Sequence, residues 1–232
     1  MHARELRRWP VPGGLLDRLG MPPEAIEARS RRAARQLVGE RWPEAEAELA
    51  ASLVYASGDP GLVDDIRFGG DPVANARAAL DGGAVVLVDV TMVGAGVRLP
   101  RGRRLAVAIG LPGAAETARR CGTTRAAAGI MTGWDDFGAG GVVAVGNAPT
   151  ALLAALDLAD GCGPPACVIA TCPGFSLAAE AKQALISSGL PHVVVAGTRG
   201  GSGLATAALN FLLQPLPPCG GGGPPRGRRG GL

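Results

Sequence analysis

Short apolar runs alternate with stretches of helical periodicity along most of this chain. Apolar residues occupy both faces of each run, so each run predicts a strand buried on both sides. The runs are 85–90, 105–109, 142–146, 167–171 and 192–197, and the helical stretches are 72–80, 113–131, 149–159, 176–188 and 203–213. Strands that alternate with helices predict a largely parallel sheet covered on both faces. The predicted fold is therefore α/β, a three-layer α/β/α sandwich in a single domain.

Three segments of different character divide the chain. Residues 1–20 carry mixed charge with little periodicity and predict a poorly ordered lead-in. Residues 21–214 form the predicted domain, which begins with two amphipathic helices between 22 and 55, each with proline near its start. Residues 215–232 contain too few apolar side chains to offset the entropy of ordering them. This basic tail is either an inert extension or a contact for an acidic partner.

Composition excludes several classes of protein. The formal charge of +3 equals the contribution of Arg226, Arg228 and Arg229 in the tail, so the body is neutral and a nucleic-acid groove is not expected. No run approaches the roughly 20 apolar residues of a membrane span. Five cysteines without a CxxC pair fit reduced thiols and a cytoplasmic location. The spacing of Cys162, Cys167 and Cys172 is wider than that of usual ligand pairs, so no metal is expected.

The candidate chemistry follows the predicted strands, because ligands bind beyond the carboxyl ends of strands in parallel sheets. The segment GNAPT (146–150) predicts a turn and a helix start whose amides face an anion such as a carboxylate, or a helix cap without a ligand. The segment TRGGS (198–202) offers a cation, glycines and a serine for carboxylates or phosphate. Neither the P-loop spacing nor GxGxxG is present, so no nucleotide cofactor is expected.

Three further charged residues stand near predicted helix starts. Arg125, after Thr123 and Thr124, is either a carboxylate clamp or a solvated residue of a first helical turn. Glu180 and Lys182 lie near the start of the helix predicted over 176–188. Most charges in such positions face water, and we expect the same of these two.

Six motifs together resemble the precorrin-8X methylmutase family of cobalamin biosynthesis, over about 25–213. They are AIEARS (25–30), D-x-x-MV-x-x-G (89–96), TTRAAAG (123–129), GGVVAVGNAPTAL (140–152), PGFSLAAEAKQAL (173–185) and RGGSG (199–203). The resemblance implies an α/β/α isomerase that moves a methyl group between adjacent carbons of a corrinoid precursor. It also implies a homodimer with the macrocycle near the subunit interface, and neither metal nor nucleotide.

The resemblance and the strand-end segments together give a set of candidate substrate-binding residues. The macrocycle carries many carboxylates, which amides, hydroxyls and arginines would bind. The set is Ser30, Ser52, Asp89, Met92, Thr124, Arg125, Asn147, Thr150, Arg199 and Ser202.

Two functional side chains of the family are replaced at the end of the second predicted helix. The family's R-x-x-H-x-x-G reads Ser52-Leu53-Val54-Tyr55-Ala56-Ser57-Gly58 here, so Tyr55 takes the place of the histidine that donates a proton. Thr198 likewise replaces one of two basic residues. A tyrosine's ordinary pKa of ~10 lies about 3.5 units above that of histidine, which corresponds to about 4.8 kcal/mol for full proton transfer.

Three functions follow from these observations. The first is a methylmutase-like isomerase with Tyr55 as the proton or hydrogen-bond donor. The second is a noncatalytic protein that binds or carries a tetrapyrrole for another enzyme, because both the histidine and the arginine are replaced. The third is a divergent paralogue that acts on another carboxylated substrate.

Overall fold

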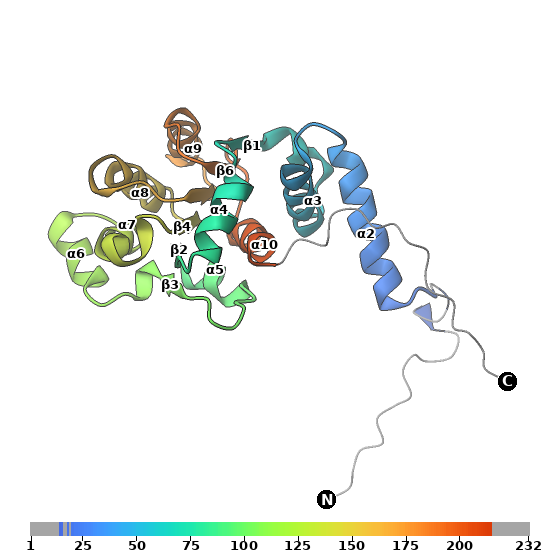
Figure 1. The fold of residues 1–232 in the computed structure, drawn as a ribbon, viewed down its shortest axis with the longest axis horizontal. Helices are drawn as coiled ribbons and strands as arrows, with labels where there is room; N and C mark the ends of the chain where they lie inside the picture. The colour runs from blue at the N-terminus through green and yellow to red at the C-terminus, as the bar shows by residue number, and fades with distance from the viewer. Residues whose placement is uncertain (1–13, 16–17, 19, 215–232) are drawn as a thin grey trace, which may run out of the picture.

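Six strands form one sheet in the order β1-β6-β5-β4-β2-β3 (Figure 1). The computed structural model describes residues 14–15, 18 and 20–214. The strands are β1 (Ile66–Gly69), β2 (Val86–Val88), β3 (Leu105–Val107), β4 (Val142–Val145), β5 (Cys167–Ala170) and β6 (His192–Val195). All neighbouring pairs are parallel except β1 and β6. The prediction of an α/β fold with a largely parallel sheet is confirmed.

Helices cover both faces of this sheet, and the three layers are visible in Figure 1. One face carries α4 (Pro72–Asp81), α5 (Thr91–Gly96) and α10 (Ser202–Leu213), with α3 (Glu44–Ser57) and then α2 (Pro23–Val38) outside α10. The other carries α7 (Arg125–Gly133), α8 (Pro149–Cys162) and α9 (Ala178–Ser187), with α6 (Ala114–Cys121) outermost. Two 3-10 helices, η1 (Pro60–Asp65) and η2 (Ala108–Gly110), and a short π-helix, η3 (Trp134–Gly138), complete the described structure.

The strands divide their side chains between two apolar cores. Val86 and Val88 of β2 pack into the core shared with α3, α4 and α10, while Leu87 between them packs into the core under α7, α8 and α9. This alternation follows from the two-residue period of a strand. Both faces are buried, which explains why the sequence shows continuous apolar runs rather than alternating polar residues.

Two elements differ from the sequence prediction. β1 is missing from it, because only its first residue, Ile66, is fully buried and the strand lies antiparallel at the sheet edge. The helix expected over 113–131 is two helices, α6 and α7. Gly122 ends α6 with a left-handed backbone at φ 61, and the Thr124 hydroxyl then accepts a hydrogen bond from the Ala127 amide to start α7.

Two of the three predicted segments are the ends of the chain. The tail over 215–232 and most of the lead-in over 1–20 lie outside the described residues. A single six-stranded sheet runs through the part between them, as a single domain requires. Within that part, no helix has the length and apolar character needed to cross a membrane.

Candidate functional site

Asp89 directly follows β2 and is fully buried at the carboxyl edge of the sheet. Its carboxylate accepts hydrogen bonds from the backbone amides of Gly146, Asn147 and Ala148 at 3.1, 2.8 and 2.9 Å. The amides of the GNAPT turn therefore hold an internal carboxylate. Of the two alternatives for this segment, amides that face a ligand's anion or a turn without a ligand, the second describes these three amides. The aspartate that satisfies them comes from another strand end, 57 residues or more away in sequence.

The electrostatics of Asp89 agree with a structural role. Burial raises the pKa of its carboxyl above the ordinary value, and the three amide hydrogen bonds oppose that shift. Asp89 thus fixes the turn between β4 and α8 and leaves the side chain of Asn147 exposed beyond it.

Two threonines join the starts of α7 and α8. The hydroxyl oxygens of Thr124 and Thr150 lie 2.7 Å apart, and Thr124 also caps α7. Thr150 lines a cavity of about 290 Å³ together with Met131. Arg125, the first residue of α7, is exposed. The structure therefore brings Thr124 and Thr150 together and leaves the Arg125 guanidinium available to a carboxylate in solution.

Lys182, the only lysine of the chain, is fully buried on α9. Its ammonium donates a hydrogen bond to the backbone carbonyl of Arg199 at 2.9 Å. Burial lowers the pKa of Lys182, while nearby Cys172 and Asp65 oppose the shift. Burial raises the pKa of the Cys172 thiol to about 11. The expectation that Lys182 faces water was wrong.

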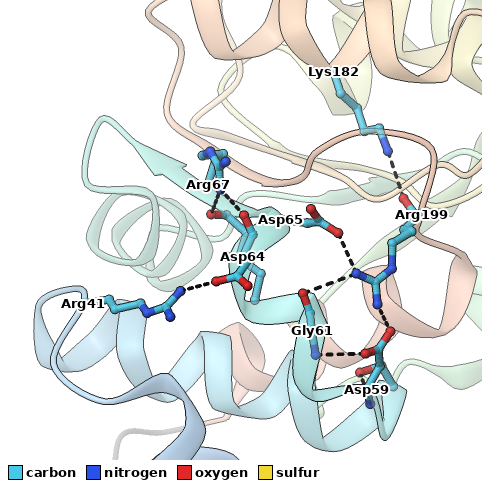
Figure 2. A network of polar contacts seen from close by, with 10 residues as sticks. Arg41, Asp59, Gly61, Asp64, Asp65, Arg67, Lys182 and Arg199 are labelled. Carbon is cyan, nitrogen blue, oxygen red and sulfur yellow. Dashed lines mark hydrogen bonds and ion pairs between the residues drawn. The ribbon is translucent and has the colours of Figure 1, made fainter.

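Arg199 is held from both its backbone and its side chain, as Figure 2 shows. Its guanidinium lies 2.8 Å from the Asp65 carboxylate, pairs with Asp59 and donates to the Gly61 carbonyl at 3.3 Å. Two carboxylates of the protein thus pair with the guanidinium that the sequence suggested as a binding group for ligand carboxylates. Arg199 connects the loop after β6 to the segment that follows α3.

The glycines of the TRGGS segment serve close packing between two strand-end loops. A Cβ atom on Gly200 would lie 1.9 Å from the carbonyl oxygen of Thr171, and its φ of 150 is one that other residues rarely adopt. The Thr171 hydroxyl donates to the Gly201 carbonyl at 3.0 Å. Ser202 is buried at the start of α10. This loop is therefore part of the scaffold around the site.

Tyr55 lies in the last turn of α3 and is 40% exposed. It is the only tyrosine of the chain. The guanidinium carbon of Arg31, on α2, lies 4.8 Å from the centre of its ring, within cation–π range. Tyr55 and Ser52 line a cavity of about 320 Å³ together with Arg31 and Arg98. We call this cavity the Tyr55 cavity.

A second cavity, also of about 320 Å³, is lined by Tyr55 and Ser30. Apolar side chains such as Leu37 and Val54 line the rest of it. The Ser30 and Ser52 hydroxyls each donate to the carbonyl four residues earlier in their helix. Each hydroxyl oxygen keeps acceptor capacity for a ligand. Tyr55, Ser30 and Ser52 therefore surround one exposed region of α2 and α3.

Large apolar side chains are exposed at the carboxyl edge of the sheet. Met92 is 72% exposed and Phe175 is 99% exposed. Leu177, two residues after Phe175, is 48% exposed. Its φ of 64 lies in the left-handed region, which residues other than glycine rarely adopt. Exposed apolar side chains in one region are typical of binding surfaces, and backbone strain is concentrated at functional sites.

The arrangement combines a phenol hydroxyl with two guanidinium groups on an open surface. The hydroxyl of Tyr55 can donate a hydrogen bond or a proton. The Nε atom of Arg31 pairs with the Glu27 carboxylate at 2.9 Å, which leaves its terminal nitrogens for a ligand carboxylate, and the Arg98 guanidinium is exposed. Neither arginine is among the site residues predicted from the sequence. Arg31 stands on the polar face of a helix, where a solvated role is the common one, and Arg98 lies just beyond a motif with no periodicity to mark it.

Comparisons with known proteins point to one family. Residues 25–215 match the family model of precorrin-8X methylmutase. The chain is similar to a precorrin-8X methylmutase from a Sinorhizobium species, with 42% identity and coverage of 75% of this chain and 86% of that protein. A precorrin-8X methylmutase of Pseudomonas aeruginosa is 40% identical, with coverage of 71% and 82%.

Solved structures agree with these sequence relatives. The fold is similar to that of a precorrin-8X methylmutase from Thermus thermophilus, with a TM-score of 0.72, 31% identity, and coverage of 82% of this chain and 96% of that chain. A second structure, described as a precorrin-8X methylmutase related protein, gives a TM-score of 0.73 at 28% identity, with coverage of 78% and 97%. The similarity extends over almost the whole length of both known structures.

Proposed function

The chain belongs to the precorrin-8X methylmutase family, and on that premise we propose that it is an isomerase of cobalamin biosynthesis. It moves a methyl group between adjacent carbons of a corrinoid precursor. The main support for this function is the similarity, at 40% identity or more, to two proteins named precorrin-8X methylmutase. They favour the isomerase over a noncatalytic tetrapyrrole carrier.

Tyr55 is the acid of this reaction in our proposal. The methyl group leaves one ring carbon and bonds to its neighbour, so the macrocycle must redistribute its electrons as the bond moves. A donor that protonates or hydrogen-bonds the macrocycle stabilises that redistribution. The exposure of Tyr55 supports this role, because its side chain lines two cavities and lies beside a guanidinium.

The remaining candidate residues divide into two groups. The first group binds the macrocycle and its carboxylates through side chains that are exposed or half-buried: Ser30, Ser52, Met92, Arg125, Asn147 and Thr150. Arg31 and Arg98 join this group. Those satisfied by other protein groups, or buried, position the loops: Asp89, Thr124, Arg199 and Ser202.

The active form is a homodimer in this proposal. Each cavity beside Tyr55, at about 320 Å³, has a volume at the lower end of the range for ligand sites, roughly 300–1,000 Å³. A tetrapyrrole needs additional walls, which a second copy would provide. The exposed side chains of Met92 and Phe175 support an interface of this kind.

The cytoplasm is the compartment we assign to the protein. Its described cysteines are all unpaired, and Cys121 and Cys162 are exposed. Exposed free thiols persist where the environment is reducing.

The decisive experiment is conversion of precorrin-8X by the purified full chain. We expect the absorbance spectrum to change while the mass of the tetrapyrrole stays the same, because an isomerase conserves atoms. Arg119→Gln, on the exposed surface of α6, is a matched control and should retain the wild-type rate. Binding of precorrin-8X with no turnover would favour the carrier function. The absence of both binding and turnover would refute both functions.

A further inference from the structure

A larger cavity, of about 890 Å³, lies near the amino ends of the strands, at the opposite end of the sheet from Asp89. Its walls come from the end of α4, the loop that precedes β3 and the end of α10. Three of the lining residues are arginines, Arg77, Arg101 and Arg103, and one, Asp81, is acidic. We call this cavity the arginine pocket. None of the motifs in the sequence analysis includes its charged residues.

Arg77 carries a charge that its surroundings only partly compensate. Its Nε atom is buried and has no hydrogen-bond partner, and one terminal nitrogen donates to the Phe211 carbonyl at 3.2 Å. The guanidinium carbon lies 4.9 Å from the centre of the Phe211 ring. Burial lowers the pKa of Arg77, and the charge of Asp81 opposes that shift. A partly desolvated cation without a contacting carboxylate is unfavourable unless an anion approaches it.

Asp81 is the acidic residue of this pocket, but it pairs with Arg103 and makes no ion pair with Arg77. Its carboxylate lies 2.6 Å from an Arg103 terminal nitrogen. Within the described part of the chain, neither Arg77 nor Arg101 makes an ion pair with a carboxylate. The pocket therefore has an excess of positive charge, with planar guanidinium donors on two separate elements.

The rest of the lining sets the kind of anion. Leu80, Pro100 and Leu212 provide apolar surface beside the guanidinium groups. Inorganic anions leave such surface unused, whereas a molecule with an apolar body and several carboxylates contacts both. We propose that the arginine pocket is a binding site for an organic polycarboxylate with an apolar body, distinct from the Tyr55 cavity.

The Tyr55 cavity and the arginine pocket are neighbours, since Gln214 lines both. The two nevertheless have different arginines: Arg31 and Arg98 belong to the former, and Arg77, Arg101 and Arg103 to the latter. Substitutions can therefore separate binding at the two sites, independently of whether the protein turns over precorrin-8X.

Trimesate, a benzene ring with three carboxylates, is a suitable probe for calorimetric titration of the full chain. We expect wild-type protein to bind it, and the double variant Arg101→Gln/Arg103→Gln to bind it at least tenfold more weakly. The matched control, Arg119→Gln/Arg120→Gln on exposed α6, should bind like wild type. Benzenetrimethanol, the neutral analogue, should not bind.

Four results would overturn the proposal. They are the absence of trimesate binding to wild type at millimolar concentration, equal binding of the neutral analogue, unchanged binding by the Arg101/Arg103 double variant, and an equally large loss in the control double variant. Arg31→Gln provides the remaining test, because a tenfold loss there would place the probe in the Tyr55 cavity instead. Circular dichroism of each variant separates loss of binding from loss of folding.

Discussion

The carboxyl edge of the sheet and the surface around Tyr55 contain similar polar residues in opposite states. At the edge, Asp89 is enclosed by three amides, and the Arg199 guanidinium is paired with Asp59 and Asp65. Around Tyr55, the phenol ring is 40% exposed and borders two cavities. Polar groups at the edge satisfy one another, whereas those around Tyr55 retain capacity for a ligand.

This difference separates positioning residues from residues that meet the substrate. A buried polar group that has all its partners stabilises one arrangement of its loops, and removing one partner leaves the others unsatisfied. An exposed group contributes little to folding, so its substitution changes chemistry more than stability. We therefore expect substitution of the buried Asp89 to lower stability and substitution of the exposed Tyr55 to lower turnover.

The largest effect on stability should come from Asp89→Ala. The substitution leaves the amides of Gly146, Asn147 and Ala148 without their acceptor at a buried turn. We expect the free energy of unfolding to fall by about 3–5 kcal/mol, measured by chemical denaturation. Ala139→Gly, in the turn after η3, is a control for a local backbone change. A loss below about 1 kcal/mol for Asp89→Ala would mean that the turn does not depend on this carboxylate.

The next effect concerns the pH dependence of stability through Lys182. Its folded-state pKa is lowered by burial, so between that pKa and the ordinary value of 10.5 the unfolded chain binds a proton that the folded chain does not. The free energy of unfolding should therefore rise with pH across that window, with a slope approaching about 1.4 kcal/mol per pH unit. Lys182→Met should lack this rise. Parallel stability curves for the two proteins would contradict the burial of the ammonium.

The smallest effect is expected for Arg199→Gln. Its ion pairs involve a side chain that is 43% exposed, and such pairs contribute roughly 0–1 kcal/mol. Because the guanidinium is paired within the protein, we expect KM for precorrin-8X to stay within about twofold, with the change confined to kcat. A tenfold rise in KM at constant kcat would instead make Arg199 a substrate clamp, as its sequence context suggested.

Strands β2, β4, β5 and β6 were predictable because burial on both faces leaves continuous apolar runs. The half-buried edge strand β3 is an apolar run as well, whereas the edge strand β1 lacks that signal. Asp89 and Arg199 were recognisable as strand-end residues, yet their partners were not. The Arg199–Asp65 contact joins residues 134 apart in sequence, and no local pattern encodes such a pairing.

The burial of Lys182 was predictable from the helical pattern around it. It follows Ala178 by four residues and precedes Leu185 by three, and both are buried on α9. Helical periodicity places all three on one face, which predicts burial. The assumption that a charged residue faces water overrode this pattern.

The most direct test of the role of Tyr55 is a turnover assay with precorrin-8X that compares wild type and Tyr55→Phe. The substitution removes only the hydroxyl, and Tyr55 is the only tyrosine, so no other phenol can replace it. We expect kcat to fall by about 100-fold or more, with KM and the free energy of unfolding nearly unchanged, as for loss of an acid catalyst. Turnover by Tyr55→Phe at the wild-type rate would contradict the assignment of this hydroxyl as the proton or hydrogen-bond donor.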